Sequence, residues 1–240
     1  MTALIICTYK ADIKNGKIDR SNFDANVQFL EGTGLFNENI KILEIGCGAG
    51  RLTNYLTQKR FNTIGIDISS TLITEGCIHY PDAIIFIASG GDMPIKDLTF
   101  DIVLSFDVLE HIPDVDTHIN EVRRILKPGG FYLLQTPNKL TNVPFEIIKN
   151  NSFTRYKKYH CSLQTYWSLK KLLISHGFEV KFKKIPVMND FIYQKIEKVF
   201  GRAGSFLLKL VNPDRLPMPI RTNFYVCGRK NEDWNSGKRT

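Results

Sequence analysis

A buried strand that runs through a glycine-rich turn into a helix most constrains how this 240-residue chain can fold. Residues 42–52 read ILEIGCGAGRL, with three glycines in five positions. Glycines let a backbone turn tightly and approach a ligand closely, and the start of the following helix favours an anionic group. About 17 residues later, a second apolar run ends at Asp67, whose carboxylate can accept two hydrogen bonds from a ribose diol. The segment therefore predicts a nucleotide site in an α/β fold.

Short apolar runs alternate with amphipathic stretches from residue 41 onward. Near-continuous apolar runs indicate strands that are buried on both faces, and strand–helix alternation predicts a parallel, doubly wound sheet. We expect strands at residues 41–45, 63–67, 83–88, 101–106, 131–135, 178–185 and 222–230, and helices at residues 22–31, 51–59, 69–77, 115–126, 163–176 and 189–211. The last helix should break near Gly201 and Gly204.

The length favours a single domain over residues 1–240. Residues 1–40 should form an N-terminal lid segment, residues 41–137 a cofactor-binding core, and residues 138–220 a cap and acceptor side that contains a sixth strand. Residues 221–230 are the last strand, and residues 231–240 form a polar tail.

The net charge of +8 is unevenly distributed. Residues 1–120 hold 9 Lys/Arg and 16 Asp/Glu (9 − 16 = −7), whereas residues 121–240 hold 23 and 8 (23 − 8 = +15). A basic half suits a phosphorylated substrate, nucleic acid or an anionic membrane surface, or it is simply a solvated face. The apolar and basic residues at 191–211 predict either an amphipathic lid that packs on the core or on a second subunit, or an interfacial membrane helix.

The five cysteines are widely spaced and form no Cys-x-x-Cys, which is typical of free thiols in a reducing compartment. The first residues lack the basic and apolar pattern of a signal peptide, and no apolar run is long enough to span a bilayer. We therefore expect a cytoplasmic protein.

The glycine loop fails the dinucleotide fingerprint, because Arg51 stands where the third glycine of Gly-x-Gly-x-x-Gly is needed. Its Glu-x-Gly-x-Gly-x-Gly pattern instead resembles motif I of the class I S-adenosylmethionine-dependent methyltransferases. The resemblance continues through Asp67, GDMP at 91–94, FDIVLSFDVLEHI at 100–112 and LKPGG at 126–130. A looser similarity in the second half, at His160, residues 169–173 and residues 176–180, is to the subfamily that includes ubiquinone-pathway O-methyltransferases.

This resemblance implies a Rossmann-like doubly wound sheet of about seven strands, mostly parallel with an antiparallel last strand, plus a helical cap insertion. It implies that S-adenosyl-L-methionine is the cofactor and S-adenosyl-L-homocysteine the product. Glu44 would anchor the methionine amino end, Asp67 the ribose and Asp92 the adenine amino group. The other residues implied to contact the cofactor are Gly46, Cys47, Gly48, Gly50, Ile68, Met93, Ser105 and Phe106.

A hydroxyl or amine acceptor benefits from a base whose pKa is near neutral. His111 follows the fourth strand, at the edge where ligands bind in such sheets, and is the first candidate; His160, in the cap, is the second. We expect His79 and His118 at the surface, and His176 at a helix end. We assign no metal ligands, but Asp107, Glu110 and His111, with or without His160, are an alternative divalent-cation site that resembles a Glu-x-x-Glu-His arrangement.

The sequence thus predicts a methyltransferase that modifies a hydroxyl of a small molecule or of a lipid- or sugar-linked acceptor. The alternative is an RNA methyltransferase whose basic half, including RYKKYH at 155–160, binds phosphates and bases. The oligomeric state stays open. A dehydrogenase is disfavoured by Arg51, and a non-enzymatic scaffold by the intact glycine loop and its acids.

Overall fold

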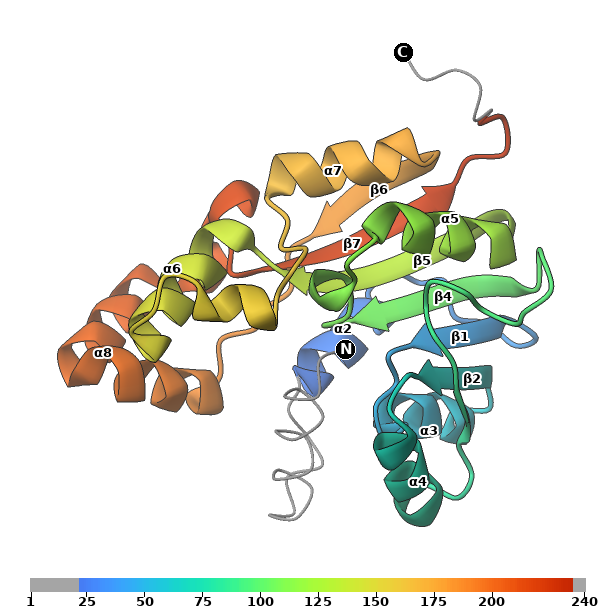
Figure 1. The fold of residues 1–240 in the computed structure, drawn as a ribbon, viewed down its shortest axis with the longest axis horizontal. Helices are drawn as coiled ribbons and strands as arrows, with labels where there is room; N and C mark the ends of the chain where they lie inside the picture. Colours follow the sequence, from blue (N-terminus) through green and yellow to red (C-terminus); the bar gives the residue numbers. More distant parts are fainter. Residues whose placement is uncertain (1–21, 235–240) are drawn as a thin grey trace.

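The computed structural model describes residues 22–234, which form one mixed sheet with helices on both faces (Figure 1). The expected structure of residues 1–21 and 235–240 lies outside this part of the chain. The strands, in chain order, are β1 (Lys41–Ile45), β2 (Asn62–Asp67), β3 (Ile84–Ile87), β4 (Phe100–Phe106), β5 (Leu126–Pro137), β6 (Phe178–Lys183) and β7 (Asn223–Lys230). Their order in the sheet is β3-β2-β1-β4-β5-β7-β6.

Strand β7 is antiparallel to both of its neighbours, and the other paired strands are parallel. The predicted seven-stranded, mostly parallel doubly wound sheet is therefore confirmed. The strand order reverses between β1 and β4, and in such sheets a ligand binds beyond the carboxyl ends of the strands at this switch point.

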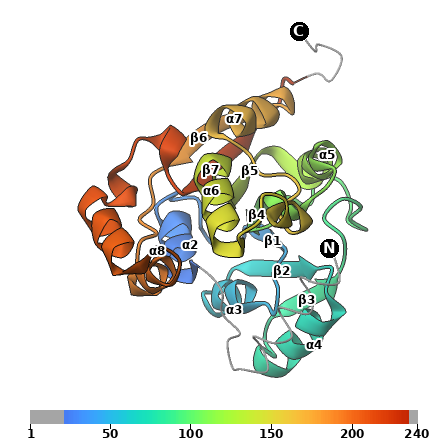
Figure 2. The ribbon, with the colours of Figure 1, turned by 60° about the vertical axis from the view of Figure 1, so that its left-hand side comes forward.

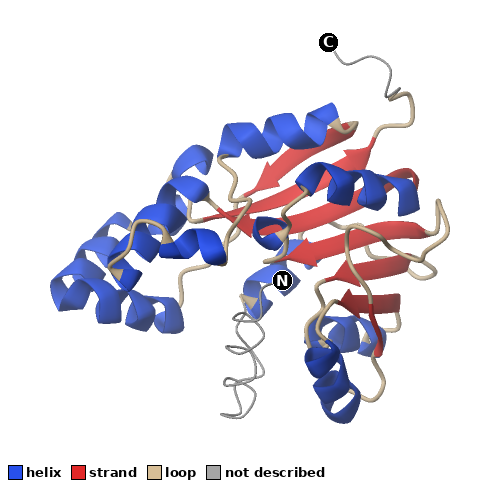
Figure 3. Cartoon of the chain, viewed as in Figure 1, coloured by secondary structure: helices blue, strands red, loops and turns tan. Residues whose placement is uncertain are grey.

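Helices cover the sheet in two layers (Figure 3). The α-helices are α2 (Phe23–Glu31), α3 (Arg51–Gln58), α4 (Ser70–His79), α5 (Val115–Ile125), α6 (Lys139–Asn150), α7 (Tyr166–Ser175) and α8 (Asp190–Val211). Within residues 22–234 the 3₁₀ helices are η1 (Leu109–His111), η2 (Arg155–Lys158), η3 (Pro213–Arg215) and η4 (Met218–Ile220). Helices α5 and α7 pack on one face, and α2 and α3 pack on the other.

The two buried apolar clusters follow from the alternation of side chains along the strands. Leu43, Val103 and Leu134 face α5 and α7, whereas their neighbours Ile42 and Ile102 face α2 and α3. Both sets are buried, which explains the uninterrupted apolar runs in the sequence.

Three local predictions differ from the structure. Strand β5 begins at Leu126, so residues 128–130 lie inside the strand, where the register with β4 shifts between Phe100 and Ile102. Helix α7 begins after Thr165, whose side chain and Ser168 form a capping box. Helix α6 was not predicted, because Pro144 within it obscured a helical pattern.

His118 is buried and not at the surface as expected. It lies on the face of α5 that packs on the sheet, beside Ile119 and Val122. Its Nδ1 bonds the carbonyl of Gly90 at 2.8 Å and its Nε2 lies 3.2 Å from the hydroxyl of Tyr132. A polar side chain at a core position is stable there because both ring nitrogens have partners.

Helices α6 and α8 gather at one end of the sheet, where β4 and β5 have their carboxyl ends (Figures 1 and 2). The two helices contact each other through the rings of Phe145 and Phe200, whose centroids are 6.1 Å apart. Helix α8 has non-helical backbone angles at Gly201 (φ 70°, ψ −179°), which agrees with the expected break. We call residues 139–215, apart from α7 and β6, the cap.

The close packing of α4 on the glycine loop gives a stability prediction. A Cβ at Gly76 would lie 2.4 Å from the carbonyl oxygen of Ala49. Gly76→Ala should therefore lower the free energy of unfolding by about 1–3 kcal/mol, although alanine normally stabilises a helix relative to glycine. Urea unfolding measures this, with Gly91→Ala as control because nothing crowds a Cβ there. Equal stability of Gly76→Ala and the native chain would contradict the close packing.

Candidate functional site

A cavity of about 510 Å³ lies at the carboxyl ends of β1, β2 and β4. This volume is typical of small-molecule sites. Its walls come from the glycine loop, the end of β2, the turn after β3, the end of β4 with η1, and the start of α2. The sequence-predicted residues that line it are Glu44, Gly46, Cys47, Gly48, Asp67, Ile68, Phe106 and His111.

The glycine loop approaches the cavity with its backbone. Gly46 and Gly48 have positive φ (72° and 58°), a region that side chains disfavour. A Cβ at Gly48 would meet no atom within 4 Å, so the loop leaves open space beside it, whereas one at Gly46 would strike Val108. Gly50 (φ 82°) starts α3 and packs near Ile85, outside the cavity lining.

The carboxylate of Asp67 joins the loop to the end of β2. Its Oδ2 accepts a hydrogen bond from the Gly48 amide at 2.9 Å, and its Oδ1 accepts one from the Ser69 amide at 2.8 Å. Burial raises the pKa of Asp67, and these amide hydrogen bonds oppose that rise. Ser69 in turn caps α4 by accepting from the Leu72 amide. Carboxylate oxygens have further lone pairs, so Asp67 can still accept from a ligand diol.

Glu44 lies at the floor of the cavity and is almost fully buried. The hydroxyl of Thr53 donates to its Oε2 at 2.6 Å. Burial raises the pKa of Glu44 to about 7, with the Thr53 hydrogen bond opposing and the nearby Asp67 adding to the rise. The carboxyl is thus poised to ionise when a cationic group binds. Burial also raises the pKa of the neighbouring Cys47 thiol, which keeps it protonated.

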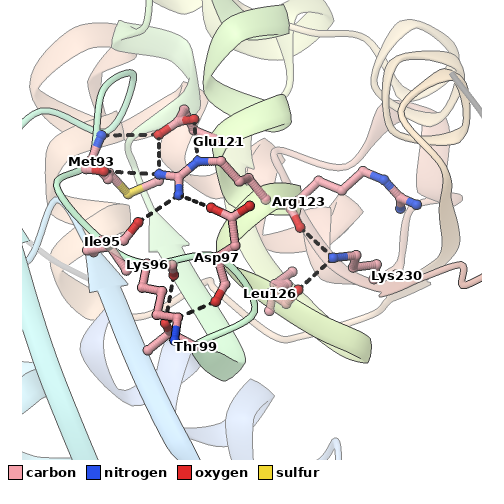
Figure 4. Close-up of polar contacts among 10 residues, drawn as sticks. Met93, Ile95, Lys96, Asp97, Thr99, Glu121, Arg123, Leu126 and Lys230 are labelled. Atoms are coloured by element: carbon pink, nitrogen blue, oxygen red, sulfur yellow. Dashed lines mark hydrogen bonds and ion pairs between the residues drawn. The ribbon is translucent and has the colours of Figure 1, made fainter.

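Hydrogen bonds with side chains of α5 hold the loop after β3 in place. Arg124 on α5 donates to the carbonyls of Met93 and Ile95 and to Asp97, and Glu121 accepts from both the Met93 amide and Arg124 (Figure 4). With His118 on the Gly90 carbonyl, these bonds set the position of the turn at residues 88–91, which lines the cavity.

Besides Gly50, three of the expected cofactor contacts lie outside the lining. Asp92 is exposed beyond the turn, and Met93 belongs to the buried core. Ser105 is fully buried, and its hydroxyl lies 2.7 Å from that of Tyr132 on the neighbouring strand. Phe106 and Ile68, by contrast, line the cavity, and Ile68 is about half exposed there.

His111 on η1 lines the cavity and is oriented by the cap. Its Nδ1 lies 2.5 Å from the carbonyl oxygen of Tyr159. Because a carbonyl only accepts, Nδ1 must donate, and Nε2 is then the basic nitrogen in the neutral ring. Burial lowers the pKa of His111, and the Tyr159 carbonyl opposes that shift.

Glu110, His111 and His160 form a cluster whose potential ligand atoms lie within 4.8 Å of one another. The His111 and His160 rings have centroids 5.1 Å apart, and Glu110 accepts from Thr136 at 3.0 Å. Burial raises the pKa of Glu110 to about 8, with Asp107 adding to the rise. Asp107, named beside Glu110 in the sequence-based alternative, precedes η1 with positive φ (53°) and is not part of this cluster. Imidazole and carboxylate ligands suit a divalent ion, and a protonated Glu110 does not.

The cavity includes residues that the sequence did not identify. Phe23 and Asn26 of α2 line it, and Arg51 lies over the Phe23 ring at 3.8 Å, which attaches α2 to the glycine loop. Asn26 also accepts from the buried Tyr225 hydroxyl at 3.0 Å. No local sequence motif predicts these contacts, because α2 and the glycine loop are separate segments of the chain. Thr117 completes the wall near η1, beside Asp107, which the sequence had named only as a possible metal ligand.

These features define a Rossmann-like domain whose cavity combines a glycine backbone cradle, a carboxylate at the end of β2 and a buried carboxyl at Glu44. Residues 17–181 match the family model described as a methyltransferase domain. Because the match covers more than half of the chain, the chain belongs to this family.

Relatives that are described as methyltransferases are similar to this chain over part of their own length. A probable S-adenosylmethionine-dependent methyltransferase of Mycolicibacterium smegmatis is 31% identical over 58% of this chain and 52% of its own. A ubiquinone biosynthesis O-methyltransferase of Nitrobacter winogradskyi is 32% identical over 49% and 44%. The chain therefore spans about half the length of these relatives.

Solved structures share the fold. A Haloferax volcanii putative methyltransferase, solved with the Trm112 methyltransferase activator, aligns with a TM-score of 0.71 at 14% identity, covering 94% of this chain and 97% of that one.

In the described part of the chain, no helix has both the length and the apolar character needed to cross a bilayer.

The raised pKa of Glu44 gives a pH prediction. Its folded pKa of about 7 exceeds the usual 4.5, so the folded chain binds more protons between these values and stability falls as pH rises from 4.5 to 7. Glu44→Gln keeps an acceptor for Thr53 and removes this proton. From pH 5 to pH 8, the native chain should lose on the order of 3 kcal/mol of unfolding free energy more than the variant. Urea titrations at both pH values measure this, and parallel losses would contradict the assignment.

Proposed function

We propose that the chain binds S-adenosyl-L-methionine in the cavity and transfers its methyl group to a hydroxyl of a small-molecule, lipid-linked or sugar-linked acceptor. S-Adenosyl-L-homocysteine would be the product. In this proposal residues 41–137 bind the cofactor, and residues 138–220 contribute the acceptor side of one domain. A cytoplasmic location agrees with the widely spaced cysteines.

The residues present fit such a cofactor. The cradle at Gly48 has space that a Cβ would fill, which suits close approach of a ligand. Glu44 could pair with the methionine ammonium group, which would lower the carboxyl's pKa by charge attraction. Asp67 could accept from the ribose hydroxyls, and Ile68 offers an apolar surface near the base.

The observation that carries the reaction type is the position of His111. It lies in the wall of the same cavity as Glu44 and Asp67, and its Nδ1–H is held by the cap carbonyl of Tyr159. The bound cofactor supplies an electrophilic methyl group. The chain must then orient the acceptor oxygen and take its proton, which Nε2 of His111 can do as a general base. His160, beside His111, would serve as a positioning or second basic group.

Replacement of His111 tests this role. His111→Gln should lower kcat about 10²–10⁴-fold, because the acceptor proton loses its base, while the cofactor affinity stays near the native value. Calorimetry with S-adenosylmethionine and a labelled-methyl assay over catechols, quinols and sugars measure the two effects.

Two variants accompany the test. His79→Gln changes a half-exposed histidine outside the cavity and should be neutral. Asp67→Ala should abolish cofactor binding, which separates loss of the site from loss of the base. Native kcat in His111→Gln would exclude His111 as the base, and absence of S-adenosylmethionine binding to the native chain would refute the whole proposal.

The cluster of Glu110, His111 and His160 supports a second use of the same residues, in which a divalent ion orients the acceptor. The raised pKa of Glu110 favours catalysis without metal. Dialysis against EDTA should therefore leave the turnover number unchanged at pH 7. If activity disappears and returns with Mg²⁺ or Zn²⁺, and His160→Ala prevents that return, the cluster is a metal site.

A further inference from the structure

Helix α8 exposes large apolar side chains to solvent. None of its side chains that the structure describes is buried. Phe206 is 62% exposed, Leu210 68% and Val211 56%. A 22-residue helix with this content normally buries an apolar stripe on its own domain, so an exposed stripe indicates an interaction surface.

The exposed residues form an ordered face. Arg202, Phe206 and Leu210 are spaced by four residues in the helical segment after Gly201, so they share one side of the helix. The Arg202 side chain is 96% exposed, and Lys209 lies beside this stripe, 5.2 Å from the Tyr193 ring centroid. An apolar stripe with basic residues at its border is the pattern of helices that lie in a membrane interface.

The charge around α8 complements an anionic surface. The cap, without α7 and β6, holds 11 Lys/Arg and 4 Asp/Glu (11 − 4 = +7). The end of α6 and the loop after it add exposed apolar side chains at Ile148 and Phe153, next to the exposed Arg155. Basic residues near anionic lipid headgroups each add attraction that falls off within a Debye length.

Other occupants fit these residues less well. A second copy of the cap would bring two groups of charge +7 together, which is unfavourable. Single-stranded RNA could stack its bases on Phe153 and Phe206, but the exposed aliphatic side chains of Ile148, Leu210 and Val211 would gain nothing from a polyanion. Aliphatic side chains gain free energy by entering the acyl boundary of a bilayer.

We propose that the Arg202–Phe206–Leu210 face of α8 docks the cap on an anionic lipid membrane. The cap lies at the end of the sheet where β4 and β5 have their carboxyl ends (Figures 1 and 2). The lining of the cavity lies at the same end of the sheet. Docking there places the acceptor side of the cavity near the lipid, so that an apolar or lipid-linked acceptor reaches it from the membrane. This use of the acceptor rests on the proposed function, whereas the docking itself does not.

Vesicle sedimentation of the full chain tests the proposal. The chain should bind vesicles of phosphatidylcholine with 30% phosphatidylglycerol at least about tenfold more tightly than pure phosphatidylcholine, and 0.5 M NaCl should weaken the binding. The double variant Phe206→Ser/Leu210→Ser should bind at least about tenfold more weakly. The matched control Ile84→Ser/Phe86→Ser removes two apolar side chains of β3 that are 50% and 55% exposed, and it should bind like the native chain.

Further outcomes separate the alternatives. Circular dichroism and S-adenosylmethionine calorimetry should be unchanged in the α8 variant, so a failed proposed function and a failed docking surface give different results. No binding of the native chain to the anionic vesicles would overturn the docking proposal. Equal loss of vesicle binding in both double variants would overturn the assignment to α8. Retardation of a 20-nucleotide RNA without vesicle binding would instead assign the basic surface to nucleic acid.

Discussion

The carboxylate of Asp67 is the interaction on which the rest of the site depends. It accepts from the amides of Gly48 and Ser69, so one buried side chain fixes the glycine loop after β1 and the start of α4 after β2. A loop with glycines at positive φ has many alternative conformations, and these bonds select one. Gly76 lets α4 approach the same loop from the other side, against the Ala49 carbonyl. The cavity is therefore formed by fixed backbone before any ligand binds.

A second junction joins the cap to η1. The Tyr159 carbonyl accepts from His111, the Ser162 amide donates to the Glu110 carbonyl, and the Ser162 hydroxyl donates to the Ile112 carbonyl. Three bonds between segments about 50 residues apart make the orientation of His111 a property of the cap. A movement of the cap, for example when it binds a surface, would therefore change the orientation of His111, the candidate base.

The sequence predicted those parts of the site that local patterns encode. The glycine loop, Glu44 and Asp67 lie within two strand–turn units, and all line the cavity except Gly50. Ser105 and Met93 could not be placed, because sequence alone does not show which face of a strand or loop turns inward. His118 looked like a surface residue because its two partners, Gly90 and Tyr132, are distant in sequence. The contribution of α2 depended on packing across the sheet, which no motif signals.

Burial of the acidic groups also changes the electrostatics of the whole chain. The formal charge of +8 counts Glu44 and Glu110 as ionised, yet their pKa values are raised to about 7 and about 8. Both carboxyl groups are therefore more protonated near neutral pH than the formal count assumes, so the acidic half is less negative than −7. The basic cap is consequently less offset than the composition indicates, which increases its attraction to an anionic surface.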